Sequence, residues 1–495
     1  MKRLILSLIP LVTLVVMVAL SIILFGSDAL GGANQISLLC ATAVCVCIAM
    51  GAWKVKWKVI EEAMERTIGT SSVSIVILLM IGMMSGAWMV SGVVPTLIYY
   101  GIQVMSPSVF LVSTCLICAV VSVMTGSSWT TVATIGIALL GIGEALDIDH
   151  AWTAGAIISG SYFGDKISPL SDTTVLASSA ARVNIFEHIR YMLHTTIPTF
   201  SIALFIFLIA GFALGNGGET NTEEYTEGLA GTFNISLWTL LVPVFTAVLI
   251  VKKVPALITL FLSAIAAGIF AIILQPEIVA TIANGAAEAG GGVIDADAAT
   301  TTAGAATTAA GASTTALSML KGVMITFFTS TAIDTGNASL NDLVSTGGMQ
   351  GMLDTVWLIL CAMCFGGAMT ATGMLQCITN QIVKMVRGRT SLVSCTALTG
   401  LSLNTMTSDQ YMSIVLTGDM YRDVYKRMGF EGRLLSRTTE DSTTVTSVLI
   451  PWNTCGMTQS TILGVATLDY LPYCFFNYLS PLMTIFISFL TRLKK

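Results

Sequence analysis

The sequence predicts an all-α polytopic membrane protein with two inverted repeats, about ten crossing helices, two re-entrant hairpins and two partly unwound helices. Composition is the first reason: 54% of the 495 residues are hydrophobic and 10% are charged, whereas soluble domains have roughly 25% charged residues. Long apolar runs are the second reason, and motifs that recur in the two halves are the third. A chain of this composition is expected to fold in a lipid bilayer.

An apolar run of about 20 residues crosses a hydrocarbon core of about 30 Å. Runs of about this length lie at 4–25, 36–53, 72–90, 195–214, 235–251, 254–274, 354–374 and 472–491. Two further runs, 151–181 and 436–468, are long enough only if their polar interruptions are included. The first run is predicted to be a retained helix, because no small-residue cleavage site precedes Asp28.

Lysine and arginine concentrate in some of the connections between these runs and are missing from the others. The basic segments are 2–3, 54–66, 182–190, 252–253, 384–389, 422–437 and 492–495. The positive-inside rule places these segments, and both termini, in the cytoplasm. We expect the chain to lie in the inner membrane of a bacterium. The net charge of -5 reflects acidic outer loops, so it indicates no nucleic-acid partner. Residues 286–315, almost all Ala, Gly and Thr, are predicted to be a poorly ordered external loop.

The cysteines and histidines form no metal-ligand motif. Cysteines such as Cys45 and Cys115 lie in apolar runs without histidine partners, where small buried thiols are expected. The three histidines, His150, His188 and His194, are predicted at the membrane interface. We therefore expect no cofactor besides transported ions.

Three motifs of the first half recur in the second. The pairs are MSGAWMVSG (84–92) with FGGAMTATG (365–373), MTGSSWTTVATIG (124–136) with MTSDQYMSIVLTG (406–418), and DTTVLAS at Asp172 with DSTTVTS at Asp441. The first pair is offset by 281 positions (367 minus 86). A duplication of this kind predicts that each half is one structural repeat.

The two repeats are predicted to be inverted. The run 72–90 adjoins a basic, cytoplasmic connection, whereas its counterpart 354–374 adjoins an acidic, external one. Secondary transporters use inverted repeats for alternating access. The predicted units are a first repeat at 1–215, an external linker at 216–234, and a second repeat at 235–495 with an external low-complexity insertion at 275–315.

Two segments have the wrong length for two ordinary crossings and are predicted to be re-entrant hairpins. The first, 109–143, enters from outside and has its polar tip at 125–128. The second, 391–421, enters from the cytoplasm and has its tip at 404–410. Non-helical backbone at membrane depth requires protein or a water-filled cavity to satisfy its N–H and C=O groups. The two tips are therefore expected to meet at a site.

A partly unwound helix follows each hairpin, at 151–181 and at 436–468. The predicted helix breakers are Gly164, Pro169, Pro451 and Gly456. Both segments contain charged residues, and an Asp or Lys near the bilayer centre costs about 2.5 to 3.5 kcal/mol. Such residues are expected to pair or to bind something. The candidate ion pairs join Lys166 to Asp165 or Asp172, and Arg437 to Glu440 or Asp441.

Asp172 and Asp409 have the stronger claim to a functional role, because hydroxyl residues flank both. Carboxylate, hydroxyl and carbonyl oxygens without Cys or His suit a hard, small cation. We therefore predict Na+ at Asp172 and Asp409. The residues predicted to tune or complete the site are Asp165, Glu440 and Asp441, and the predicted neutral ligands are Ser127, Ser128, Thr173, Ser408, Thr443 and Asn453.

The same carboxylates also suit a proton. A low-dielectric pocket favours the protonated form of a carboxyl group, so a cation and a proton compete for it. This competition exchanges sodium for protons if the site opens to one side at a time.

At these residues the sequence resembles the NhaC family of sodium/proton antiporters, over about residues 35–470. The motifs are TGSSWTTVATIGIALLGIG, GDKISPLSDTT, TSDQYMSIVLTG, LSRTTEDSTTVTSVLIPWNTCG and GNASLNDLVSTGGMQGML. The resemblance implies sodium-driven or proton-driven exchange through paired hairpins. It leaves the substrate open, since family members are assigned to sodium/proton exchange, to malate uptake coupled to sodium and lactate, or to amino-acid exchange. The chain departs from the family pattern at SSWTT, where a glycine is expected closer to Trp129, and in the insertion at 286–315.

Three other functions compete with sodium/proton exchange: exchange of an organic solute, proteolysis and a channel. With a small organic anion or an amino acid as cargo, sodium would be the coupling ion, and hairpin helix N-termini with Lys166 or Arg437 would bind the carboxylate. An intramembrane aspartyl protease using Asp165 and Asp409 is disfavoured by the inverted repeat, so no enzyme is expected. A channel is disfavoured because hairpins from both faces suit the two gates of a carrier. A homo-oligomer is compatible with each alternative.

Overall fold

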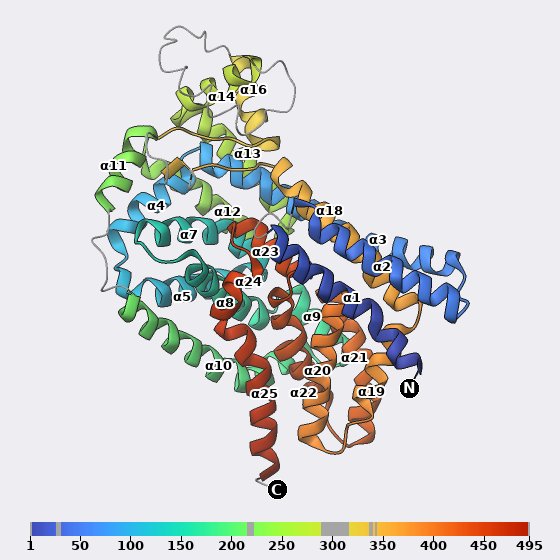
Figure 1. The fold of residues 1–495 in the computed structure, drawn as a ribbon. Helices are drawn as coiled ribbons and strands as arrows, with labels where there is room; N and C mark the ends of the chain where they lie inside the picture. The colour runs from blue at the N-terminus through green and yellow to red at the C-terminus, as the bar shows by residue number, and fades with distance from the viewer. Residues whose placement is uncertain are drawn as a thin grey trace.

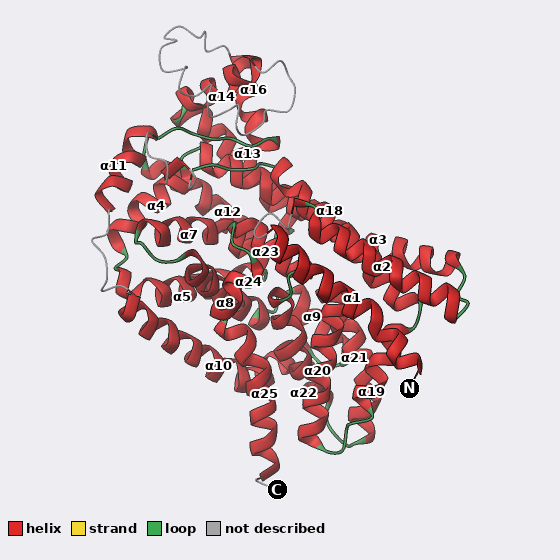
Figure 2. Cartoon of the chain, in the orientation of Figure 1, coloured by secondary structure: helices red, strands yellow, loops and turns green. Residues whose placement is uncertain are grey.

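The structure is a computed structural model of the chain and describes residues 2–25, 31–214, 222–288, 316–335, 340–341 and 344–493. Within these ranges the regular elements are helices, apart from one isolated antiparallel bridge between Thr331 and Thr346 (Figure 2). Eight of the described helices are long and apolar enough to cross a membrane, and up to ten crossings result if each of two bent pairs is one span. These findings confirm the predicted all-α polytopic membrane protein.

Long helices alternate with short ones in the first half of the chain. They are α1 (Lys2–Phe25), α2 (Ala33–Ala52), α3 (Trp57–Val90), α4 (Val93–Val104), α5 (Pro107–Thr125), α6 (Ser128–Thr131), the π-helix η2 (Val132–Gly136), α7 (Ile137–Ala145), α8 (His150–Ile167), α9 (Asp172–Ala180) and α10 (Ile185–Leu214). Gly92 ends the turn between α3 and α4 with a φ of 80°, a left-handed conformation that glycine adopts without a Cβ penalty.

The second half has a similar mixture of elements. They are α11 (Thr222–Thr232), η3 (Leu237–Leu240), α12 (Leu241–Val251), α13 (Ala256–Leu274), α14 (Pro276–Glu288), α16 (Ala316–Phe328), η5 (Gln350–Met352), α18 (Leu353–Ala371), α19 (Met374–Val383), α20 (Arg389–Thr407), α21 (Gln410–Arg427), α22 (Gly432–Thr439), the π-helix η6 (Glu440–Thr444), η7 (Ser447–Leu449), α23 (Thr454–Leu463), α24 (Thr467–Tyr470), η8 (Leu471–Tyr473) and α25 (Phe475–Leu493). The helix α11 lies in the predicted linker and α14 in the predicted insertion. Residues 289–315 of that insertion lie outside the described residues.

The long helices form two flanks joined by the C-terminal helices. Figure 1 shows α1, α2, α3 and α18 side by side on one flank, where α18 packs against both α2 and α3. On the other flank α5 packs against α8 and α10. The helices α20, α21, α22 and α25 lie toward the C-terminal end of the molecule, and α14 and α16 project at the opposite end (Figure 1).

Small residues bring α8 against α5. A Cβ at Gly160 would lie 2.1 Å from the carbonyl oxygen of Cys115, and a Cβ at Gly164 would lie 2.4 Å from that of Ala119. Only glycine allows the two backbones to approach this closely. The prediction that Gly164 breaks its helix is therefore wrong, because it lies inside α8; Gly456 likewise lies inside α23.

The helices of the two predicted hairpins have matching bounds. Pro107 starts α5 and Arg389 starts α20, 282 positions later (389 minus 107). The same offset relates the ends of α5 and α20, the starts of α6 and α21, the ends of α7 and α21, the starts of α8 and α22, and the starts of α9 and α23. Two segments far apart in the sequence thus have helix boundaries at equivalent positions.

The first hairpin tip is the turn between α5 and α6. Gly126 is left-handed there, with a φ of 66°. The hydroxyl of Thr125 accepts a hydrogen bond from the backbone N–H of Ser127 (3.3 Å) and lies 3.1 Å from the hydroxyl of Thr131. Ser127 caps α6, because its hydroxyl accepts a bond from the N–H of Thr130 (3.2 Å).

The second tip, between α20 and α21, has the same conformation and the same bonds. Ser408 is left-handed, with a φ of 58°. The hydroxyl of Thr407 accepts a bond from the N–H of Asp409 (3.3 Å) and lies 2.8 Å from the hydroxyl of Ser413. Asp409 caps α21 by accepting a bond from the N–H of Met412 (2.7 Å). These positions correspond to those of the first tip at the offset of 282 residues.

The helix after each hairpin is interrupted, as predicted. Residues 168–171 separate α8 from α9, and residues 450–453 separate η7 from α23. Pro169 and Pro451 lie in these breaks, where the missing proline N–H removes no helical hydrogen bond.

The third predicted motif pair is out of register with the other two. Asp172 is the first residue of α9, after the first break, and the residue 282 positions later is Thr454, the first residue of α23 (454 minus 172). Asp441 lies in η6, before the second break. The predicted pairing of Asp172 with Asp441 is therefore wrong, because short runs of Asp and Thr match without occupying equivalent positions.

Candidate functional site

Asp165 lies near the end of α8, where the first hairpin tip meets the first break. The residue is 6% exposed. Its Oδ2 accepts hydrogen bonds from the backbone N–H (3.1 Å) and the hydroxyl (2.7 Å) of Ser128, and its Oδ1 accepts one from the hydroxyl of Ser171 (2.6 Å). No lysine, arginine or histidine of the described chain lies within ion-pair distance of it. Neutral donors alone therefore stabilise this carboxylate.

Asp409 occupies the second tip and is 7% exposed. Its carboxylate lies at the N-terminus of α21, where the helix dipole favours negative charge. The N–H of Thr454, at the start of α23, donates to the carbonyl of Ser408 (2.9 Å). Each tip therefore contacts the break of its own half, while α21 packs against α9, and η2 and α7 pack against α23, across the two halves.

Glu440 and Asp165 are joined by a chain of hydroxyls that crosses between the halves. The hydroxyl of Ser171, which donates to Asp165, lies 2.9 Å from the hydroxyl of Thr173. Thr173 donates to Glu440 Oε1 (3.1 Å), and Thr444 donates to Oε2 (2.8 Å). Glu440 is fully buried. Each hydroxyl has a single proton to donate, so the contact between Ser171 and Thr173 becomes a hydrogen bond when one of the two carboxyl groups is protonated and donates to its hydroxyl. The chain is then continuous, and a proton can transfer along it.

Lys166 and Arg437 share a single anion. The Lys166 ammonium forms an ion pair with Asp441 Oδ1, and Arg437 Nε lies 3.8 Å from Oδ2. All three side chains are buried. The predicted pairing of Arg437 with Asp441 is confirmed, whereas the predicted pairing of Lys166 with Asp165 or Asp172 is wrong.

Both cations have a further contact. Lys166 donates to the hydroxyl of Ser480 on α25 (3.0 Å), and its Nζ lies 5.4 Å from the ring centre of Phe476. The Arg437 guanidinium lies 4.9 Å from the ring centre of Tyr191 on α10. Arg437 Nε and Nη2 are buried and have no hydrogen-bond partner in the described chain.

Asp172 differs from the other acidic residues of the site because it is exposed at the start of α9. Among the described residues no hydrogen bond joins it to Asp409, its predicted partner in holding Na+. Tyr411, in the first turn of α21, lies close enough to Asp165, Asp172 and Asp409 for the charge of each to act on it. This tyrosine lies among carboxylates from both halves.

The predicted neutral ligands divide into two groups. Protein partners engage Ser127, Ser128, Thr173 and Asn453. The hydroxyl oxygens of Ser408 and Thr443 are buried and have no hydrogen-bond partner in the described chain. Ser408 lies at the second tip beside Asp409, whereas Thr443 Oγ1 faces Gly400 on α20, where a Cβ would lie 2.0 Å from it.

Sequence reasoning missed two amides that bind the π-helix η6. Asn404 donates to the carbonyl of Thr443 (2.6 Å), and Gln410 donates to the carbonyl of Thr444 (2.9 Å). Both residues are buried and lie at the ends of the predicted tip 404–410. Their position at the tip could have identified them, because a side-chain amide at membrane depth requires hydrogen-bond partners.

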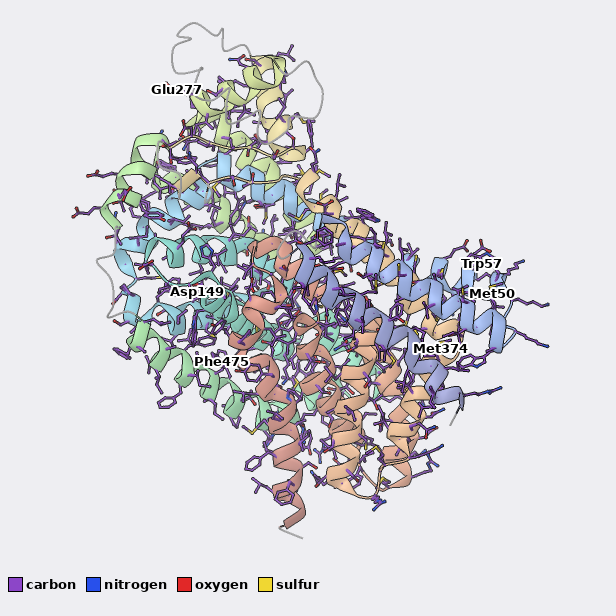
Figure 3. All side chains as sticks on the ribbon, viewed as in Figure 1. Met50, Trp57, Asp149, Glu277, Met374 and Phe475 are labelled. Atoms are coloured by element: carbon purple, nitrogen blue, oxygen red, sulfur yellow. The ribbon has the colours of Figure 1, made fainter. Side chains whose placement is uncertain are left out.

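His188 is buried among the helices, near the start of α10. Its Nδ1 lies 2.8 Å from the hydroxyl of Ser436. His150, by contrast, has a side chain that is 49% exposed and lies 3.3 Å from Glu144. Figure 3 places Asp149, the residue before His150, at the start of α8.

The contact between the first hairpin tip and the first break can be tested at Gly126. Alanine there is expected to destabilise the protein more than alanine at Gly373, since both are left-handed (φ 66° and 72°) and each costs about 1 to 2 kcal/mol for that conformation. At Gly126 the added Cβ would also lie 2.7 Å from Leu170 Cβ, whereas at Gly373 nothing lies within 4 Å. Thermal denaturation in detergent checks the difference. Equal losses would contradict the contact between the tip and the break.

The model of the Na+/H+ antiporter family matches residues 2–184, 160–294 and 289–491 of the chain. The chain belongs to this family.

Relatives within the family are similar over most of their length. The chain is 34% identical to the Na(+)/H(+) antiporter NhaC of Alkalihalophilus pseudofirmus over 441 residues, which cover 88% of this chain and 86% of the relative. It is 34% identical to the arginine/ornithine antiporter ArcD of Halobacterium salinarum over 487 residues, covering 98% and 91%. It is 33% identical to the malate-2H(+)/Na(+)-lactate antiporter of Bacillus subtilis over 426 residues, covering 86% and 82%. The resemblance to NhaC is confirmed.

Within this Na+/H+ antiporter family member, no three His, Cys, Asp or Glu side chains of the described residues are arranged to hold a metal ion. The acidic groups are instead separated and surrounded by hydroxyls, amides and backbone groups. Such an arrangement suits a weakly held cation that must leave again, bound by one carboxylate and neutral oxygens.

Proposed function

We propose that the protein is a secondary active transporter that exchanges sodium for protons across the cytoplasmic membrane by alternating access. The observation that supports this best is the set of three buried carboxyl groups, Asp165, Asp409 and Glu440, none of which forms an ion pair in the described chain. A buried carboxylate without a counter-ion is costly, and either a proton or Na+ removes that cost. One bound cation, either Na+ or a proton, is enough to neutralise a carboxylate, so the binding of one displaces the other.

Asp165 is the shared carrier in this proposal, together with Asp409. Neutral donors hold its carboxylate in one orientation, while the hydroxyl chain through Ser171 and Thr173 connects it with Glu440. Asp172, which is exposed near Asp165, would be the first ligand to meet an arriving cation. The unpartnered oxygen of Ser408, beside Asp409, would complete the coordination of Na+.

Alternating access requires two arrangements of the halves about this site, and inverted repeats supply them. The matching helix boundaries and the equal bonds at the two tips support a duplication, with the repeats at 1–215 and 235–495. We propose that both hairpins are re-entrant. The basic connections support cytoplasmic termini and an inner-membrane location for a bacterial host.

Proton movement in everted vesicles tests the exchange. With an imposed pH gradient, sodium is expected to dissipate the gradient in vesicles that contain the protein and to leave control vesicles unchanged. Lithium and potassium, added in turn, report the selectivity. If no inorganic cation moves protons under any gradient, sodium/proton exchange is refuted.

The second candidate is sodium-coupled exchange of a small organic anion or an amino acid. Arg437 supports it, because Nε and Nη2 form one edge of the guanidinium that makes no hydrogen bond, with Asp441 only within ion-pair distance (3.8 Å), and such an edge matches a carboxylate group. Malate, lactate, arginine and ornithine are the probes, since two relatives are named for these solutes. If sodium moves protons only when one of these solutes is supplied, the organic exchanger replaces the simple one. We propose no catalytic activity and no cofactor in either case.

A further inference from the structure

A row of hydroxyl residues lies on one face of α25. Ser480, Thr484 and Ser488 are four residues apart, a spacing that places side chains on the same helix face. All three are fully buried, because α25 packs against α8, α10 and α20. Exposed apolar residues occupy its other faces: Leu482, Phe486, Phe489 and Leu490. Figure 3 places Phe475 at the start of this helix.

Two hydroxyls of this row lack partners. Thr484 Oγ1 and Ser488 Oγ are buried and make no hydrogen bond in the described chain. Hydroxyls in helices usually donate to a carbonyl one turn back, as Thr195 and Thr199 do on neighbouring α10 (2.8 Å each). A buried hydroxyl without a partner costs about 1 to 3 kcal/mol. Water beside two such hydroxyls, one turn apart, would remove this cost by filling their hydrogen bonds.

The row starts at the buried ion pair. Ser480 accepts a hydrogen bond from Lys166 (3.0 Å), which pairs with Asp441. From Ser480 to Ser488 the helix rises about 12 Å, at 1.5 Å per residue. Ser488 lies five residues before Leu493, the last described residue, at the end of the chain that the positive-inside rule assigns to the cytoplasm.

A buried histidine lies in the same region. His188 on α10 is close enough to Asp441 and Lys166 for their charges to act on it. Its Nε2 is buried and has no partner in the described chain. The helix α10 packs against both α22 and α25, and His188 contacts Ser436 on α22, so the unpartnered nitrogen lies on a helix that adjoins α25.

We infer that α25 and α10 line a water-filled pathway from the cytoplasm to the Lys166–Asp441 ion pair, by which protons reach the exchange site. Each hydroxyl accepts one proton from the water on one side and gives one to the water on the other, so no residue changes its net charge. The pathway itself depends only on the fold. The identity of the ion that passes rests on the proposed sodium/proton exchange.

Cysteine accessibility tests the pathway. The eleven native cysteines are first replaced, and Thr484→Cys, Ser488→Cys and the control Thr42→Cys are then introduced singly. Thr42 lies on α2, is buried, and donates to the carbonyl of Leu38 (2.8 Å). A small, positively charged methanethiosulfonate is added to the cytoplasmic face of everted vesicles. Both α25 thiols are expected to react at least about tenfold faster than the control thiol, because modification requires a hydrated thiolate. If both react as slowly as the control, the pathway is refuted.

A second measurement uses the native chain. Thr484→Val with Ser488→Ala is expected to slow sodium-driven proton movement while leaving sodium affinity unchanged, and Thr42→Val on α2 is the matched control. An unchanged rate would overturn the role in proton transfer. Reactive α25 thiols in a protein that moves no protons would instead refute the proposed exchange and leave the pathway standing.

Discussion

Asp441→Asn is expected to destabilise the protein by about 3 to 5 kcal/mol, the range for removing one partner of a buried ion pair. Asp441 is the common anion of two buried cations, Lys166 in the first half and Arg437 in the second. Asparagine keeps the shape but leaves both positive charges without compensation. A lower midpoint of thermal denaturation in detergent is the measurement.

The matched control is Glu62→Gln in α3. The Lys58 and Glu62 side chains are 81% and 63% exposed and lie 4.0 Å apart, so losing this pair is expected to cost at most about 1 kcal/mol. Adding Lys166→Met to Asp441→Asn removes one of the two uncompensated charges and should restore part of the lost stability. If Asp441→Asn is no more harmful than Glu62→Gln, the shared-anion arrangement is incorrect.

Asp165→Asn is expected to abolish sodium-dependent proton movement while leaving the fold intact. Asparagine can keep its oxygen toward Ser128 and turn its amide toward the hydroxyl of Ser171, which is able to accept a hydrogen bond. The charge and the exchangeable proton are lost, so neither Na+ nor a proton is bound there. Vesicle assays should show the activity of empty vesicles, with a normal denaturation midpoint.

Asp149→Asn supplies the control on the same helix. Asp149 caps the other end of α8 by accepting bonds from the N–H groups of Ala151 (2.9 Å) and Trp152 (3.3 Å). Asparagine is an equally good cap, so transport and stability should both remain normal. Full transport by Asp165→Asn would remove this residue from the exchange site.

Local patterns in the sequence were sufficient to predict the helix breaks and the turns that form the candidate site. The helix breaks follow from Pro169 and Pro451, since proline and the polar residues around it interrupt a helix whatever the tertiary context. The hairpin tips follow from polar clusters within apolar runs. The α-helical membrane class follows from composition, because no soluble fold buries so many apolar residues with so few charges.

Contacts between residues far apart in the sequence could not be predicted from local sequence patterns. Lys166 pairs with Asp441, 275 positions away, and sequence proximity instead favoured Asp165 and Asp172. Gly164 was assigned to a break because glycine has low helix propensity, whereas its role is the close contact with α5. The burial of His188 depends on the packing of α10 against α22, which the neighbouring basic residues do not reveal.

Proton release on sodium binding tests the central claim most directly. Calorimetric titration of the purified protein with Na+, in two buffers of different ionisation enthalpy and at several pH values, counts the protons released for each sodium bound. A shared carboxyl site predicts that sodium binding releases protons, that sodium affinity falls as the pH is lowered, and that Asp165→Asn loses both effects. Sodium binding with an unchanged affinity at every pH and no proton release would contradict the account.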